Sequence, residues 1–184
     1  YSDKGNFWGE HYPTLLTNYY EGLLETKDPF CGSASNPMMR KTSVENVGGY
    51  DENVKTGEDW EMYIRLSREF KFDSVQSVLV DIRQHNGVRL GDRVDAALGT
   101  DMLVLEKHFE NMSDHLKTLY YRKIAFKMLR LGTKRSALKY IYRCLRTKLW
   151  DAHAYVLLVS LFLPRRVLVE INNMRRILRQ RNFL

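Results

Sequence analysis

Residues 56–72 read TGEDWEMYIRLSREFKF and place two adjacent carboxylates, Glu58 and Asp59, directly before an apolar helical pattern. The large side chains behind this pair recur every three or four positions, which predicts a helix with one buried face. Acidic residues in a first turn stabilise a helix by accepting hydrogen bonds from its free amides and by opposing its dipole. Capping needs only one carboxylate, so Asp59 is also a candidate general base at an exposed helix start.

The segments on either side of this helix predict a layered α/β domain. Residues 31–36 (CGSASN) are small and polar, so a ligand can approach their backbone closely, and Gly32 and Ser33 are candidates for that contact. Residues 37–52 predict a short strand, a helical turn and a tight turn at the two adjacent glycines. Residues 71–85 predict one or two strands. Strand, turn, helix and strand in this order are typical of α/β layers.

From about residue 95 onward the chain is predicted to be wholly helical, and one short helix is expected near the amino terminus. Apolar periodicity and the breaks at Gly132 and Pro164 give these helical ranges: 12–25, 96–110, 116–131, 134–149 and 152–163. We therefore expect two domains, residues 1–94 and residues 95–184. The apolar run at 154–164 is too short to cross a bilayer, so it is either a core helix or an interfacial one.

Charge is distributed unevenly along the 184 residues. Residues 1–100 carry 11 Lys and Arg against 16 Asp and Glu, a net −5, whereas residues 101–184 carry 18 against 6, a net +12. The basic half either meets a polyanion, such as an anionic membrane, or is a solvated helical surface. At its end, an apolar seam runs among arginines and predicts a basic amphipathic helix. The seam consists of Val167, Ile171, Met174 and Leu178.

Four short motifs in residues 30–90 together resemble the second half of the catalytic domain of family 2 glycosyltransferases, which have the GT-A fold. They are an arginine-bearing strand, a Gly-Gly-aromatic-acid turn, an acidic pair opening a helix, and a strand that ends in Arg-x-His. Here they correspond to Arg40, Gly48-Gly49-Tyr50-Asp51, Gly57-Glu58-Asp59-Trp60 and Arg83-Gln84-His85. Each motif alone is weak, but their shared order and spacing are specific.

The resemblance implies that the protein is an inverting transferase that moves a sugar from a nucleotide-diphosphate donor to an acceptor hydroxyl. Asp59 would remove the proton of that hydroxyl. Glu58 and Trp60 would contact the substrates, together with Gly32 and Ser33.

Positive charge near the departing diphosphate would come from Arg83, and His85 would help to bind a divalent metal, Mg or Mn. Both residues are equally consistent with structural roles at a strand end.

The chain departs from the family pattern in lacking a D-x-D metal motif and an amino-terminal nucleotide-binding unit. We therefore expect the carboxy-terminal portion of a longer enzyme, inactive in isolation, whose metal is held mainly by other residues; a noncatalytic relative is the other interpretation. The expected acceptor is a glycan or a lipid-linked molecule of cell-surface glycan synthesis.

Two cysteines without metal-ligand spacing suggest a reducing, cytoplasmic location, with peripheral binding to the inner face of the plasma membrane. The alternative function is a basic helical module that binds nucleic acid or a protein. Nucleic acid is not the expected partner, because the tyrosines among the basic residues recur at core spacing.

Overall fold

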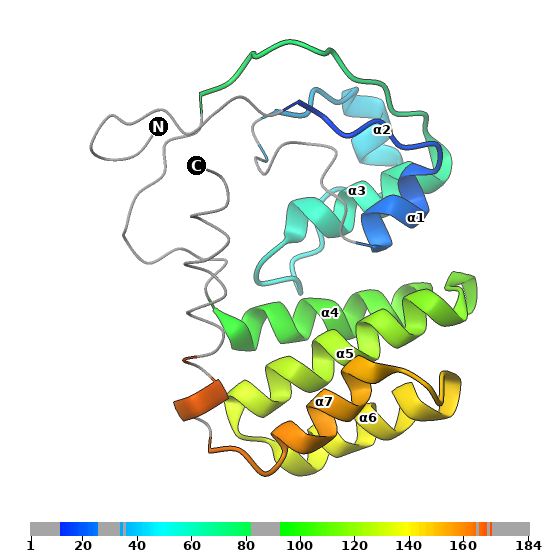
Figure 1. Cartoon of the computed structure of the whole chain (residues 1–184). Coiled ribbons are helices and arrows are strands. Elements are labelled where there is room, and N and C mark those ends of the chain that lie inside the picture. Colours follow the sequence, from blue (N-terminus) through cyan, green and yellow to red (C-terminus); the bar gives the residue numbers. More distant parts are fainter. Residues whose placement is uncertain are drawn as a thin grey trace. The chain divides into compact units, whose positions relative to one another are not determined.

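The computed structural model describes residues 12–25, 34, 36–81, 93–164, 166–168 and 170 of the chain. The chain divides into two compact units, Tyr1–Arg89 and Leu90–Leu184. All regular secondary structure in the described ranges is helical, as Figure 1 shows.

The first unit contains helices α1 (Tyr19–Leu24), α2 (Lys41–Asn46) and α3 (Glu58–Glu69). Helix α1 packs against α3, and side chains from both helices are fully buried, including Leu23 and Leu24 of α1 and Met62 and Ile64 of α3. Helix α3 begins at Glu58, which confirms the helix predicted behind the acidic pair. Its buried face holds that pair at a fixed place in the unit.

Helix α1 is shorter than the helix predicted over residues 12–25. The side-chain oxygen of Asn18 accepts a hydrogen bond from the amide of Glu21 at 3.1 Å, and this cap begins the helix at Tyr19. Residues 12–17 precede the cap and are not helical. The predicted helix was too long at its amino-terminal end, because the apolar pattern continues before Asn18, the residue that caps α1.

The short strand predicted within residues 37–52, and the strands predicted within residues 71–85, are wrong for the residues that the structure describes, which end at 81 in the second stretch. A strand is stabilised by backbone hydrogen bonds to a neighbouring strand, and no described segment pairs with residues 71–81 in this way. Side chains make the contacts instead, because Phe72 stacks on Tyr19 with ring centroids 5.1 Å apart and Gln76 donates to the carbonyl of Pro13. The described part of this unit is therefore helical rather than α/β.

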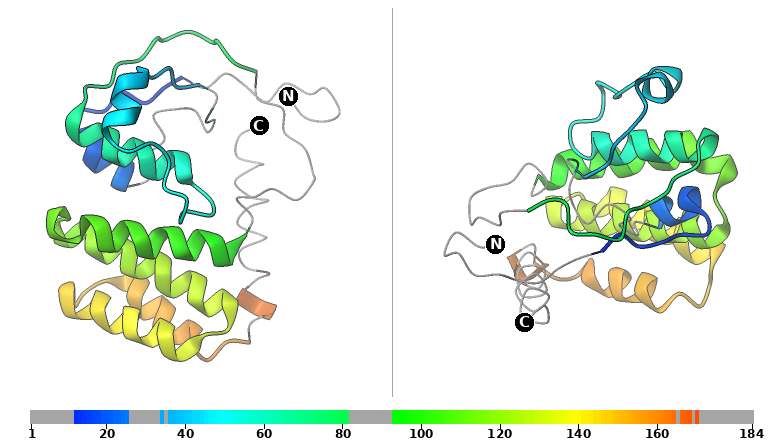
Figure 2. Two further views of the ribbon diagram at one scale, coloured as in Figure 1. Left: turned by 180° about the vertical axis from the view of Figure 1, so that it is seen from behind. Right: turned by 90° about the horizontal axis from the view of Figure 1, so that it is seen from above.

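The second unit contains α4 (Val94–His108), a 3-10 turn η2 (Phe109–Asn111), α5 (Asp114–Leu131), α6 (Lys134–Thr147) and α7 (Ala152–Ser160). The all-helical prediction is confirmed over its described residues, with ends within a few residues of those expected. Helix α5 contacts α4, α6 and α7, and the views of Figure 1 and Figure 2 agree on this arrangement. Fully or nearly fully buried side chains line α5: Leu116, Tyr120, Ile124, Ala125 and Leu129.

Local capping sets where the helices of this unit begin and end. Ser113 caps α5 and Asp151 caps α7, each by accepting a backbone amide three residues ahead. Gly132 ends α5 with φ of 86°, a left-handed conformation that glycine adopts without strain. Asp151 also accepts from Arg122 of α5 at 3.1 Å, so the cap of α7 is fastened to the central helix.

No helix in the described part of the chain is long and apolar enough to span a membrane. Of the predicted basic amphipathic seam, Val167 is described and exposed, whereas Ile171, Met174 and Leu178 lie outside the described residues.

One lysine of α5, Lys123, has a buried ammonium group. Within the described part of the chain its Nζ has no hydrogen-bond partner, and it lies 4.6 Å from the centroid of the Tyr120 ring. Burial lowers the pKa of Lys123 to about 8; the nearby Asp101 carboxylate opposes this shift and the charge of Lys127 adds to it. The folded chain thus gives up this proton more easily than the unfolded chain does.

We predict that the free energy of unfolding gains a contribution from Lys123 as the pH rises from about 8 to about 10.5, because the unfolded state then binds more protons than the folded state. Lys123→Met should remove this dependence and stabilise the protein near neutral pH, by at most about 3 kcal/mol. Denaturant titrations of both proteins at several pH values measure the difference. The exposed Lys139→Met is the control, and an identical pH dependence in wild type and Lys123→Met would contradict the prediction.

Candidate functional site

The candidate site lies at the start of α3. Gly57, with φ of 73°, takes a left-handed conformation just before the helix and directs the chain into its first turn. Glu58, Asp59 and Trp60 follow, and each is half-buried. The acidic pair therefore remains accessible to solvent beside the positive end of the helix dipole.

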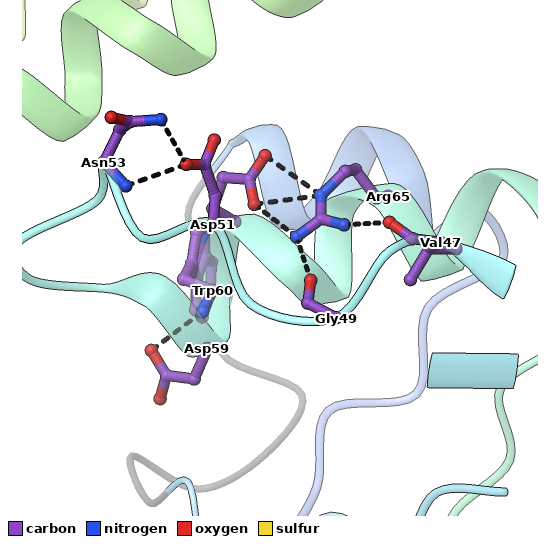
Figure 3. A network of polar contacts seen from close by, with 8 residues as sticks. Val47, Gly49, Asp51, Asn53, Asp59, Trp60 and Arg65 are labelled. Atoms are coloured by element: carbon purple, nitrogen blue, oxygen red, sulfur yellow. Dashed lines mark hydrogen bonds and ion pairs between the residues drawn. The ribbon is translucent and has the colours of Figure 1, made fainter. Parts of the chain in front are cut away.

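Asp59 is held by the backbone of its own turn. Its Oδ1 accepts a hydrogen bond from the amide of Trp60 at 2.7 Å, so one oxygen satisfies a free amide of the first turn. Figure 3 shows this carboxylate pointing away from the polar network around Arg65. This contact agrees with the capping interpretation, and the other oxygen of Asp59 has no hydrogen-bond partner among the described residues. The general-base role of Asp59 stays a prediction.

Trp60 joins the site to the neighbouring helix. Its indole Nε1 donates to the carbonyl of Leu23 at the end of α1, at 3.1 Å. This contact orients the residue next to Asp59, and it gives Trp60 a structural role beside the substrate contact predicted for it.

Tyr63 lies one turn further along α3 and is nearly fully buried. Burial raises the pKa of Tyr63 to about 12, with smaller contributions from the Asp59 carboxylate and from Tyr50. The phenol therefore stays neutral at any physiological pH. The same interactions show that the Gly-Gly-Tyr turn, the Tyr63 ring and Asp59 share one neighbourhood.

A buried ion pair, which the sequence analysis missed, fixes α3 to the Gly48-Gly49 turn. Glu61 is fully buried, and both of its oxygens accept from the guanidinium of Arg65, at distances of 2.7 to 3.1 Å. The same guanidinium donates to the carbonyls of Val47 and Gly49 (Figure 3). The spacing of Glu61 and Arg65, four residues apart on a helix, predicts contact but gives no sign of burial.

The two carbonyls that accept from Arg65 belong to Val47, just after α2, and to Gly49 in the glycine turn. Gly48 and Gly49 have φ of 80° and 67°, which side chains rarely allow, and the Gly49 amide donates to the carbonyl of Val44 in α2. Asn46 adds a second link by donating to the Glu69 carboxylate at 3.1 Å. The described hollow lined by Thr42, Glu45 and Phe70 lies at the opposite end of α3 from the acidic pair.

Four predicted site residues, Gly32, Ser33, Arg83 and His85, lie outside the described residues, so their predicted roles stay predictions. Within the described ranges, no three His, Cys, Asp or Glu side chains gather closely enough to hold a metal ion. The described acids alone do not fit a divalent cation, which usually needs several oxygen ligands. What the described arrangement offers is one carboxylate, that of Asp59, held in place at the start of α3.

Comparison with known protein families identifies the family of this chain. The family described as "Glycosyltransferase like family 2" matches residues 11–123, more than half of the chain, and confirms the resemblance found in the sequence. The match includes α1, α2 and α3 and continues through α4 into α5. No curated protein and no solved structure matches the chain.

We predict that Arg65→Ala destabilises the protein by about 3 to 5 kcal/mol, because it leaves the Glu61 carboxylate buried without a counter-charge. Denaturant unfolding of the full chain measures this loss. Adding Glu61→Gln to Arg65→Ala should recover part of the stability, since it removes the buried charge.

The control is Lys41→Ala, which breaks the Lys41–Glu45 pair of the same helical spacing on the exposed surface of α2. An exposed pair contributes about 1 kcal/mol or less. Equal losses for Arg65→Ala and Lys41→Ala would show that burial of Glu61 does not matter.

Proposed function

The chain belongs to glycosyltransferase-like family 2, and from this premise we propose that it takes part in inverting sugar transfer with Asp59 as the general base. The observation that carries the proposal is the half-buried carboxylate of Asp59 on the first turn of α3, inside the matched region. The donor is a nucleotide-diphosphate sugar, and the acceptor is a hydroxyl of a glycan or a lipid-linked glycan.

In the proposed step, the acceptor oxygen attacks the anomeric carbon while its proton passes to Asp59. The bond from that carbon to the diphosphate oxygen breaks, and the nucleoside diphosphate leaves with the electron pair. A hydroxyl is a poor nucleophile at neutral pH, so a carboxylate within hydrogen-bond reach speeds this attack.

The surroundings of Asp59 support its role by limiting its movement. Its Oδ1 is engaged with the Trp60 amide, and the Trp60 indole is tied to α1, so the turn that carries the base is fixed at two points. The Arg65 network holds the rest of α3 against the glycine turn. Fixed positioning matters because a misplaced base loses much of its effect.

We propose that Glu58 orients the helix start, that Gly32 and Ser33 line the substrate path, and that Arg83 neutralises charge on the leaving diphosphate. For the family's metal, His85 is the candidate ligand. The described residues do not form a metal site, so no step is assigned to a metal here.

Binding of nucleic acid, the alternative function, gains little from the basic helices. For bases to stack on the tyrosines of these helices, the tyrosine rings would have to be exposed. Tyr120 and Tyr121 are buried in α5, and Tyr140 packs against Tyr121 with ring centroids 6.2 Å apart. These rings are part of the core, and Tyr142 is the exposed one of the four.

We predict that Asp59→Asn lowers sugar transfer by roughly two to four orders of magnitude, because the amide cannot accept the proton. Release of nucleoside diphosphate, followed in the complete gene product with a panel of donors, measures the rate. The unfolding midpoint should stay close to that of the wild type, since the asparagine oxygen can still accept from the Trp60 amide.

Asp73→Asn is a matched control, because the Oδ1 of Asp73 accepts from the next amide, that of Ser74, at 2.8 Å in the same way. This exposed residue should tolerate the change without loss of rate. Near-normal turnover by Asp59→Asn would rule out Asp59 as the base.

A further inference from the structure

Helix α7 has apolar side chains on nearly every side, although only one side of it is buried. Ala154 and Leu157 are buried against the rest of the second unit. The opposite side, the α7 outer face, consists of four exposed residues: Ala152, Tyr155, Val156 and Val159. A helix that is apolar all round is ordinarily buried on all sides. The outer face therefore indicates a surface that meets a partner.

Two large aromatic residues flank the α7 outer face. Trp150 precedes the helix and Phe162 follows it, and each is 85% exposed. Leu149, beside Trp150, is also exposed. Tryptophan and tyrosine, with an apolar ring and one polar group, suit a boundary between water and an apolar phase.

Helix α6 places a row of cations next to this face. Residues 134–148 contain no acidic residue, and their six basic residues are all exposed: Lys134, Arg135, Lys139, Arg143, Arg146 and Lys148. None of the six is paired with a carboxylate in the part of the chain that the structure describes. The nearby Asp151 is buried and engaged with Arg122.

Helices α6 and α7 run as antiparallel neighbours, so the helix that carries these exposed cations lies beside α7. The ammonium of Lys134, at the start of α6, donates to the carbonyl of Leu163, just beyond α7, at 3.4 Å. At the other end, a short turn joins Lys148 to Asp151, with the Asp151 amide donating to the Lys148 carbonyl. Figure 1 and Figure 2 show α6 and α7 side by side.

We propose that the α7 outer face, with Trp150 and Phe162, docks in the headgroup layer of an anionic lipid bilayer. Apolar side chains would enter the boundary of the acyl chains, while the α6 cations would meet lipid phosphates. Nine residues cannot span a bilayer, so α7 would lie in the plane of the interface. A second copy of the chain fits less well, because pairing two such faces would bring two rows of like charge together.

Vesicle flotation of the full chain tests the proposal. Equimolar phosphatidylcholine and phosphatidylglycerol vesicles should bind the protein, binding should weaken as salt is added, and pure phosphatidylcholine vesicles should bind far less. Arg135→Gln and Arg146→Gln should each lower the vesicle partition coefficient about fivefold. Absence of binding to the anionic vesicles would overturn the proposal.

Val159→Glu places a charge in the α7 outer face and should lower the partition coefficient about tenfold or more. Val75→Glu in the first unit is the matched control, because the two valines are 65% and 64% exposed. The control should bind like the wild type. Equal loss in both variants would contradict the assignment of the surface.

Trp150 supplies a local readout, since a tryptophan emission spectrum shifts to shorter wavelength when the indole leaves water. Vesicles should cause this shift in the wild type, and Trp150→Phe should abolish it while leaving most of the binding. A chain truncated before residue 171 should still bind. Loss of all vesicle binding on truncation would overturn the proposal. The proposal would also fail if Val159→Glu left vesicle binding unchanged and only converted a dimer to a monomer in solution.

Discussion

The first unit depends on where the guanidinium of Arg65 donates its hydrogen bonds. A carboxylate as buried as that of Glu61 is costly unless it is paired, and the Arg65 fork pairs it while also satisfying the carbonyls of Val47 and Gly49. One side chain thus neutralises an acid inside α3 and fastens the glycine turn to the helix. The planar, five-donor shape of arginine makes this possible, and a lysine cannot replace it.

Fixing the helix also fixes what stands at its start. Asp59 belongs to the same helix as Arg65, but its carboxylate points away from that network and is engaged with the amide of its own turn. The unit therefore separates two acids by environment. Glu61 is buried and paired with Arg65, whereas Asp59 is only half-buried and has one oxygen without a hydrogen-bond partner among the described residues.

The second unit is organised around α5, which carries more buried side chains than any other described helix of the unit, and also the arginine that fastens the cap of α7. Its packing leaves different chemistry on its two outermost helices. The cations of α6 and the valines of α7 are exposed, so the outer surface of these two helices carries both charged and apolar side chains. The charge count alone also allowed the interpretation that the basic half is a solvated helical surface. That interpretation does not account for the exposed valines.

The amino-acid sequence alone predicts a helix that starts near Glu58, the helical nature of the second unit and the family. These follow from short-range signals: apolar periodicity, a glycine after a helix, and motifs in a fixed order. Three features emerge only in the folded chain: Glu61 is buried, residues 71–81 have no strand partner among the described segments, and one side of α7 is exposed. Burial and strand pairing depend on segments far apart in the chain, and no local pattern records which segments meet.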